Sequence, residues 1–192
     1  MSNDTFLIVG LGNPGAGYSA NRHNVGQMAL DVLAARIGGS FKKAKTTAVV
    51  AEGRLGAGGP KLVLAKSTGY MNTSGGPVSA LLKFYDIPLA NLIVLHDELD
   101  IDAEKVRLKF AGGHGGHNGL RDIIAACDSN EFARVRIGVG RPPGQMDSAD
   151  YVLRDFSSTE RKELPTTLEI AADAVEAIIA EGVAKATMRF HV

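Results

Sequence analysis

Two residues far apart in the sequence carry the chemistry of a hydrolytic site. His23 lies just before a predicted helix, and Asp97 follows the apolar run of residues 92–95. A histidine beside a carboxylate is a general base, because the carboxylate fixes the ring tautomer and stabilises the imidazolium that forms. No serine occurs in a G-x-S-x-G motif, and Cys127 lies in a predicted helix where a small buried residue is expected. The pair therefore favours hydrolysis by a water molecule that His23 activates.

Three asparagines can serve the same site. Asn13 follows the predicted strand of residues 6–9, Asn72 lies just beyond the strand of residues 61–66, and Asn118 lies in a later loop. The carboxyl ends of strands in open α/β sheets line the crevice where ligands bind. Side-chain amides supply donors for a developing oxyanion or a peptide carbonyl. Asn13 is equally well explained as a turn residue that bonds its own backbone.

A metal site is the alternative interpretation of the same region. Two histidines form His114-x-x-His117 among glycines, not on a helix face, and no H-E-x-x-H or comparable spacing occurs. Without such spacing the sequence predicts that no metal is needed. The residues with ligand chemistry are His96, Asp97, Glu98, Asp100, His114 and His117.

Glycines near the N-terminus spell a dinucleotide-binding pattern that fails its own requirements. Gly10, Gly12 and Gly15 follow an apolar strand, as in G-x-G-x-x-G. That fingerprint needs a helix to begin at the third glycine and an acidic residue at the end of the next strand. Here the periodic apolar pattern begins only after His23, and Asp31 falls inside the helix. We therefore expect no dinucleotide cofactor.

The apolar patterns predict strands that alternate with helices. This alternation indicates an α/β fold in a single domain over residues 1–192, with a twisted, mostly parallel mixed sheet and helices on both faces. The expected strands cover residues 6–9, 45–53, 61–66, 92–95, 105–110 and 132–140, and the expected helices cover residues 25–37, 78–85 and 120–127.

Caps and breakers refine two of the helices. Thr73 or Ser74 is placed to cap the helix of residues 78–85. Ser157 and Glu160 form a capping box for a C-terminal helix that we expect to be interrupted near Pro165. That helix resumes over residues 168–180, and the pattern assigns no structure to residues 187–192.

Charge and cysteine content bound the partners and the compartment. Lysine plus arginine equals aspartate plus glutamate at 21 each, which argues against coating of long nucleic acid but allows a local basic patch. With one cysteine, no basic-then-apolar leader pattern and no long apolar run, we expect a cytoplasmic protein without a membrane span. By composition alone a solvated face explains the basic cluster of Lys105, Arg107, Lys109, Arg121, Arg134, Arg136 and Arg141.

Six separated blocks, in order along the chain, closely resemble bacterial peptidyl-tRNA hydrolases. This resemblance implies a mostly monomeric α/β enzyme that hydrolyses the ester between a peptide and the 3′-terminal ribose of tRNA, recycling tRNA from prematurely released peptidyl-tRNA. It implies no cofactor. The blocks are GLGNPG at residues 10–15, RHN at 22–24, GYMNTSG at 69–75, HDELD at 96–100, GHGGHNGL at 113–120 and RVRIGVGRP at 134–142.

The resemblance also implies a role for each matching residue. His23 matches the catalytic base and Asp97 the carboxylate that orients it. Asn118 matches a residue that grips the acceptor strand or assists there, and Tyr18 an aromatic position near the 3′ adenosine. The channel for the peptide and the 3′ end matches Asn13, Met71, Asn72 and His117, and the clamp on the tRNA 5′-phosphate matches Lys109 and Arg136.

One position departs from the family pattern, and one alternative activity remains. Ala111 replaces the first of three glycines that often precede the first loop histidine, which bears on loop flexibility alone. An RNA-binding module that has lost catalysis fits the same fold. The presence of both His23 and Asp97 speaks against it, because a pure binder does not need that pair.

Overall fold

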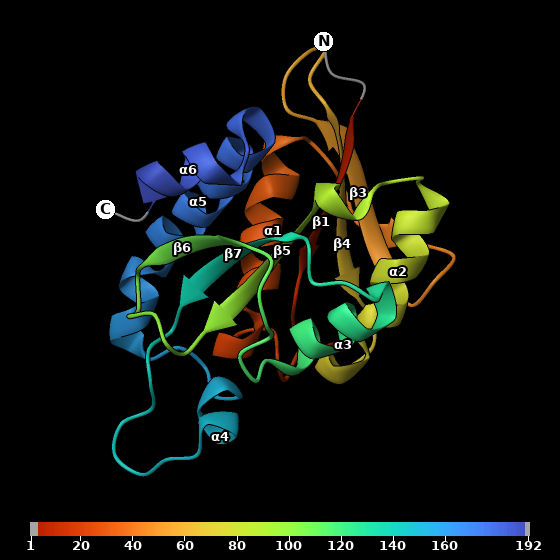
Figure 1. Cartoon of the computed structure of the whole chain (residues 1–192). Coiled ribbons are helices and arrows are strands. Elements are labelled where there is room, and N and C mark those ends of the chain that lie inside the picture. The colour runs from red at the N-terminus through yellow and green to blue at the C-terminus, as the bar shows by residue number, and fades with distance from the viewer. Residues whose placement is uncertain (1–3, 191–192) are drawn as a thin grey trace.

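The computed structural model describes residues 4–190, which form one seven-stranded mixed sheet covered by helices on both faces (Figure 1). The predicted α/β class is therefore confirmed. The strands are β1 (Thr5–Gly10), β2 (Lys42–Lys43), β3 (Ala48–Arg54), β4 (Lys61–Ser67), β5 (Leu92–Glu98), β6 (Val106–Phe110) and β7 (Ala133–Gly138).

The strand order across the sheet is β2-β3-β4-β1-β5-β7-β6. The four central strands β4, β1, β5 and β7 run parallel, and antiparallel strands lie at both edges. Because these four strands run in the same direction, their carboxyl ends lie together at one end of the sheet. The predicted site residues converge at these carboxyl ends.

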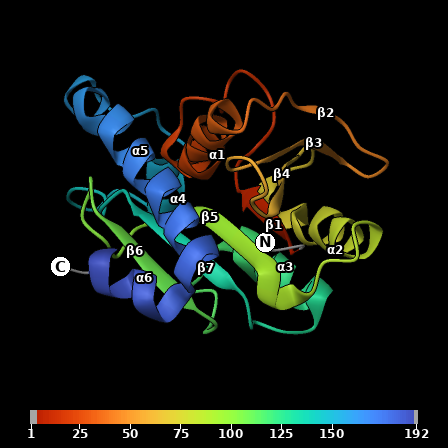
Figure 2. The same ribbon diagram turned by 90° about the horizontal axis from the view of Figure 1, so that it is seen from above.

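The helices form a layer on each side of the sheet, as Figure 2 shows from above. One layer holds α2 and α3, which pack on each other, and the other holds α1, α5 and α6. No helix within residues 4–190 combines the length and apolarity needed to cross a lipid bilayer. The helices are α1 (Val25–Arg36), α2 (Gly75–Phe84), α3 (Asn118–Cys127), α4 (Ser148–Val152), α5 (Ser158–Glu181) and α6 (Val183–Phe190), and the short 3₁₀ turns are η1 (Arg22–Asn24), η2 (Met71–Thr73) and η3 (Leu89–Asn91).

The core lies on both faces of the central strands. Ile8 and Ile93 pack with α1 and α5, whereas Leu7 and Val94 pack with α2 and α3. Strands buried on both sides read as continuous apolar runs, which is why β1 and β5 show no alternation in the sequence. These rigid strands hold the residues at their carboxyl ends in fixed positions.

Strand β5 is longer than the sequence predicts. It continues to Glu98, because β7 pairs with it as far as that residue, with His96 opposite Arg136 and Asp97 opposite Ile137. Asp97 therefore lies inside the strand, not after it. Its backbone is fixed by the sheet, and its side chain projects from a rigid element.

The C-terminal helices also differ from expectation. Pro165 does not interrupt α5, which runs for 24 residues and loses one backbone hydrogen bond at the proline. The Ser157 and Glu160 capping box is confirmed. Residues 187–190 of the unassigned tail form the second half of α6, an amphipathic helix that packs on β6, while residues 191–192 lie outside the described residues.

Helix α2 begins three residues earlier than predicted. Neither Thr73 nor Ser74 caps it with a side chain, because the Ser74 hydroxyl donates to the Met71 carbonyl instead. The first amide of the helix, that of Gly75, donates to the Asp122 carboxylate of α3 at 2.7 Å. A partner 47 residues away in the sequence therefore replaces the local cap.

Close packing explains the N-terminal glycines. A Cβ on Gly10 would lie 2.5 Å from the carbonyl oxygen of Gly26, and a Cβ on Gly26 would lie 2.2 Å from that of Leu95. No helix begins at Gly15, and the first helical turn begins at Arg22. The glycines thus allow the start of α1 to touch β1 and β5, which sets η1 directly above the end of β5.

We expect Gly26→Ala to lower the free energy of unfolding by about 1–3 kcal/mol, because its Cβ overlaps the Leu95 carbonyl. Gly76→Ala is the matched control, since Gly76 is likewise the second residue of its helix and nothing lies within 4 Å of its Cβ position. That control gains up to about 1 kcal/mol from helix propensity. Urea denaturation measures both, and equal stability of the two variants would contradict the packing argument.

Candidate active site

A cleft of about 500 Å³ opens at the carboxyl ends of the parallel strands. The segments that follow β1 and β4, the end of β5, the glycine loop of residues 112–117 and α4 all contribute to its walls. The cleft brings together predicted residues from across the chain: Asn13, His23, Met71, Asn72, Asp97, His117 and Asn118.

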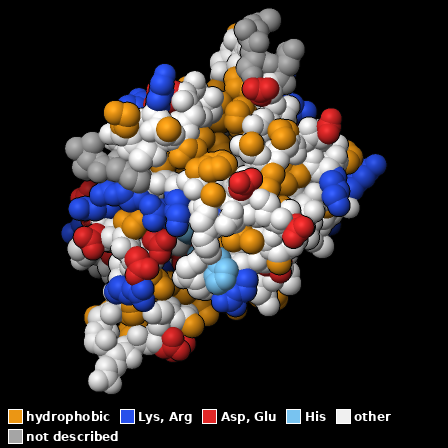
Figure 3. Space-filling view, in the orientation of Figure 1, with side chains coloured by type: hydrophobic (Ala, Val, Ile, Leu, Met, Phe, Trp, Pro, Cys, Tyr) orange, Lys and Arg blue, Asp and Glu red, His pale blue; other side chains and the backbone are white. Residues whose placement is uncertain are grey.

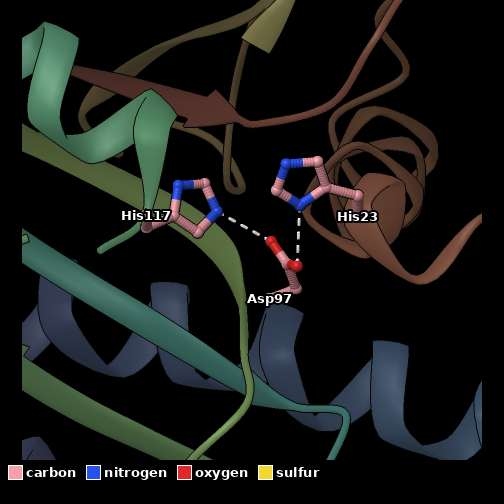
Figure 4. A group of neighbouring side chains, drawn as sticks. All are labelled: His23, Asp97 and His117. Carbon is pink, nitrogen blue, oxygen red and sulfur yellow. Dashed lines mark hydrogen bonds and ion pairs between the residues drawn. The ribbon is translucent and has the colours of Figure 1, made fainter. Parts of the chain in front are cut away.

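Asp97 lies at the centre of the cleft with a histidine on each side (Figure 4). Its side chain is only 3% exposed. The Nδ1 atom of His23 lies 2.8 Å from Oδ2, and the Nε2 atom of His117 lies 2.7 Å from Oδ1. Each carboxylate oxygen therefore has its own imidazole partner.

The pKa values of this cluster follow from burial and from these contacts. Burial acts to raise the pKa of Asp97, but the charges and hydrogen bonds of His117 and His23 outweigh it and hold that pKa well below its usual range. Burial acts to lower the pKa of His23, but the charge and hydrogen bond of Asp97 leave it raised. Asp97 is therefore an ionised carboxylate, which only accepts hydrogen bonds, so both facing ring nitrogens carry protons.

His117 has no ring nitrogen left for catalysis. It is the N-cap residue of α3, and its Nδ1 accepts hydrogen bonds from the amides of Gly119 at 3.1 Å and Leu120 at 3.4 Å. Its Nε2–H donates to Asp97. Because Nδ1 accepts the amides of the helix start, the nitrogen that donates to Asp97 is Nε2, and both ring nitrogens are engaged.

His23 is arranged in the opposite way. Its Nδ1–H donates to Asp97, which leaves the lone pair of Nε2 as the free acceptor of a ring that lines the cleft. The side chain keeps 14% of its surface exposed. Of the two histidines on Asp97, His23 is thus the one able to accept a proton from a molecule in the cleft.

Three hydrogen bonds, each between a backbone group and a side chain, hold Asn13 in place. The backbone N–H of Asn13 donates to Oδ1 of Asn24, and Nδ2 of Asn24 donates to the backbone carbonyl of Asn13, each at 2.9 Å. The side-chain Oδ1 of Asn13 accepts the backbone N–H of Met71 at 2.7 Å. Since Oδ1 is engaged, the Nδ2 group is what Asn13 offers to the cleft. The residue is therefore more than a turn residue that satisfies its own backbone.

The remaining polar and aromatic residues line the mouth of the cleft. Asn72 and Asn118 are exposed there, at η2 and at the first position of α3. Tyr18 lies outside the cleft lining, but its ring packs edge-on against Tyr70, with 6.3 Å between centroids. Tyr70 itself lines the cleft and is 58% exposed.

Lys109 and Arg136 lie apart from the cleft, on the β6–β7 edge of the sheet. In the register of the two strands, Arg136 lies opposite Arg107, and Lys109 lies opposite Arg134, two residues further along. Figure 3 shows lysine and arginine side chains in a row over β6. The amine of Lys109 lies over the glycine loop, 2.7 Å from where a Cβ of Gly112 would stand.

The predicted basic cluster is not one continuous surface. Arg134 is 1% exposed and donates to the carbonyls of Gly112 and Gly113, each at 2.8 Å. Arg141 is paired with Asp100. Arg134 therefore fixes the start of the glycine loop that carries His117, a structural role that composition does not reveal.

The metal alternative finds limited support in the geometry. Within residues 4–190, His23, Asp97 and His117 have potential ligand atoms within 4.8 Å of one another. Of the six residues with ligand chemistry that the sequence suggests, only Asp97 and His117 belong to this cluster of described residues. Both imidazoles already donate protons to Asp97, so a cation has to displace both protons to bind there.

Three buried polar residues of the site have structural roles that the sequence does not predict. Arg22 pairs with Glu160 of α5 at 2.6 Å and stacks on the Tyr151 ring at 4.0 Å, which anchors η1 and so His23. Asn24 holds Asn13. Burial lowers the pKa of His96 to about 3, so its ring is neutral where it packs against His117. For Arg22 and Asn24, the available signal is that these two polar residues flank His23 at the start of an otherwise apolar helix.

The fold and this donor set define an α/β enzyme of the hydrolase class. The sequence profile of peptidyl-tRNA hydrolases matches residues 7–192. The peptidyl-tRNA hydrolases of Arthrobacter sp. (strain FB24) and Pseudarthrobacter chlorophenolicus are 62% and 61% identical over 98% of this chain, covering 97% and 96% of their own. The crystal structure of the Acinetobacter baumannii peptidyl-tRNA hydrolase superposes with a TM-score of 0.89 at 35% identity, covering 99% of this chain and 96% of that one. The chain belongs to the peptidyl-tRNA hydrolase family, whose members are carboxylic ester hydrolases.

We expect Asp97→Asn to bring the pKa of His23 below its ordinary value. The substitution removes the charge that raises this pKa, while the burial that lowers it remains. Titration of the ring by NMR, with the signal assigned by loss in His23→Gln, measures the shift. Asp100→Asn is the control, because Asp100 is an exposed carboxylate paired with Arg141. An unchanged His23 titration in Asp97→Asn would show that the carboxylate does not control the base.

Proposed function

We propose that this protein hydrolyses the ester between a peptide and the 3′-terminal ribose of tRNA, using a water molecule activated by His23. The observation that carries the proposal is the hydrogen bond from His23 Nδ1 to the buried, ionised Asp97, which leaves Nε2 as a base in the cleft. Membership of the family supports the substrate class.

The reaction needs one proton to move twice. Nε2 of His23 accepts a proton from water as the oxygen attacks the ester carbonyl carbon, and a tetrahedral oxyanion forms. The imidazolium, stabilised by Asp97, then donates that proton to the departing ribose oxygen as the acyl C–O bond breaks. The products are a tRNA with its terminal hydroxyl restored and a free peptide carboxylic acid, which releases the second proton of the water to solvent and becomes a carboxylate.

The asparagines and Met71 complete the proposed substrate channel. Nδ2 of Asn13 is the donor best fixed for an oxyanion or a peptide carbonyl, because three backbone bonds hold its residue. Asn72 and Asn118 offer further donors at the mouth, where Asn118 grips the acceptor strand. His117 acts by holding Asp97, and Tyr18 with Tyr70 forms an aromatic edge suited to the terminal adenosine.

Lys109 and Arg136 are proposed to bind the 5′-phosphate at the other end of the acceptor stem. Two cations on adjacent strands, outside the cleft and beside the glycine loop, give a small phosphate site. A chain with equal numbers of acidic and basic residues can bind tRNA in this way, because few phosphates are contacted. We propose that the protein acts as a monomer in the cytoplasm without a metal.

We expect His23→Ala to slow the release of N-acetyl-amino acid from N-acetyl-aminoacyl-tRNA by at least about a hundredfold, as loss of a general base does. His114→Ala is the matched control, since His114 is a half-buried histidine of the same cleft that makes no contact with Asp97 among the described residues. EDTA is present throughout. If the wild-type protein binds tRNA and cleaves nothing, the fold serves binding alone, and loss of activity on chelation would favour the metal alternative.

We expect the double variant Lys109→Ala/Arg136→Ala to raise KM for substrate with a 5′-phosphate by about tenfold or more, as loss of charge-assisted hydrogen bonds implies. The same variant should leave KM for dephosphorylated substrate unchanged. Lys105→Ala, an exposed lysine just before β6, is the control. An equal rise in KM for both substrates would place the 5′-phosphate elsewhere.

A further inference from the structure

A second hollow of about 730 Å³ lies on the far side of α2 from α3, between that helix and the β2–β3 edge of the sheet. Its floor is apolar and includes Val50 of β3 and Leu81 of α2. We call it the α2 groove. The proposed function leaves this groove without a role.

The chemistry of the α2 groove is basic and aromatic. Lys42, Lys43 and Lys45 border it on the β2 side, and Phe84 borders it on the helix with 65% of its surface exposed. The acidic residue in its wall, Glu52, is neutralised by Lys61 at 2.7 Å and bonded by the Tyr85 hydroxyl at 2.9 Å. The lysine charges therefore remain available to an acidic occupant.

The α2 groove and the active-site cleft have no lining residue in common, but short segments of the chain connect them. The turn between β2 and β3 lies against the end of β4, where the Thr68 amide donates to the Thr47 carbonyl at 2.9 Å, and Tyr70 of the cleft follows two residues later. Gly76, Ala80 and Phe84 are exposed four residues apart and form one stripe along α2, and the exposed Asn72 lies in η2 just before that helix. Nothing lies within 4 Å of the Cβ position of Gly76, so the stripe is open at that point.

The position of the groove decides between RNA and peptide as its occupant. The proposed phosphate clamp lies on the β6–β7 edge, and the α2 groove lies at the opposite edge of the sheet, with the cleft between them. An acceptor stem bound at the proposed clamp leaves the cleft toward β6, which puts the peptide, on the other side of the ester, toward α2. The ten residues of α2 span about 15 Å, which an extended peptide covers in about five residues.

We propose that the α2 groove binds the upstream part of the peptide, about five residues from the ester, and favours acidic and aromatic side chains there. This inference rests on the proposed function. Carboxylates of the peptide pair with the lysines of the β2 side, and an aromatic side chain packs on Phe84. The groove thereby makes cleavage of longer peptidyl-tRNAs depend on the sequence of the peptide.

The test compares three substrates on the same tRNA. One carries a single N-acetyl-amino acid, and two carry N-acetyl-hexapeptides that are identical next to the ester and begin with Asp-Phe-Asp or Lys-Phe-Lys. We expect Lys45→Glu to lower kcat/KM for the acidic hexapeptide by about fivefold, the upper range for a pair of exposed charges, without affecting the single-residue substrate. Phe84→Ala truncates the aromatic wall, and Gly76→Leu blocks the stripe. Both variants should slow cleavage of the two hexapeptide substrates and leave cleavage of the single-residue substrate unchanged.

Controls separate the possible failures. Lys162→Glu removes an exposed lysine of α5, on the other face of the sheet, and should act equally on all three substrates. If the groove variants slow the short substrate as much as the hexapeptides, the groove binds tRNA and the inference is overturned. If they slow none, the groove has no peptide. Wild-type protein that fails on the short substrate refutes the proposed function itself, whereas loss confined to hexapeptides supports the inference.

Discussion

The burial of the Asp97 carboxylate is the constraint on which the rest of the site depends. A carboxylate in the interior is costly unless charged or hydrogen-bonded partners surround it, and here the two imidazoles of His23 and His117 supply them. Because its pKa is depressed, Asp97 stabilises the fold at neutral pH, and this contribution is lost as the pH falls below about 3.9 toward the depressed value. The raised pKa of His23 acts in the other direction, so its contribution is complete below about 6.5 and is lost as the pH rises through the raised value.

The two imidazoles are made different by the elements that carry them. His117 ends the glycine loop and caps α3, so a helix start holds one of its nitrogens, while Arg134 holds the beginning of the same loop. His23 lies in η1, which Arg22 anchors to α5 and which Gly26 allows to approach β5. One carboxylate thus has one partner whose second nitrogen is engaged by a helix start and one partner whose ring lines the cleft, and the distinction comes from packing, not from residue type.

The sequence predicts best what depends on neighbouring residues. The strands β1 and β4, helix α1 and the Ser157 capping box all follow from local patterns and agree with the structure. Asp97 and His23 can also be selected from the sequence as candidates, because those residue types have few roles beside strand ends. The residue assignments, however, came from the resemblance to a family, since pairing across 74 residues leaves no local signal.

What the sequence did not predict depends on contacts made at a distance. Strand β5 is extended by β7, α2 is capped by Asp122, and Arg22 finds Glu160 across 138 residues. None of these partners can be identified before the sheet order is known.

The same order gives the site its direction. The cleft lies over the central strands, with the exposed cation of Lys109 toward one edge of the sheet and the lysines of β2 toward the other. A substrate whose two halves are an RNA and a peptide has to leave such a cleft on two sides. Charge alone cannot sort the halves, because both edges are basic. The exposed aromatic wall and apolar floor beside α2 suit side chains of a peptide, whereas the paired cations on adjacent strands β6 and β7 suit a phosphate. In the proposed function, the orientation of the ester over His23 then follows from where each half is bound.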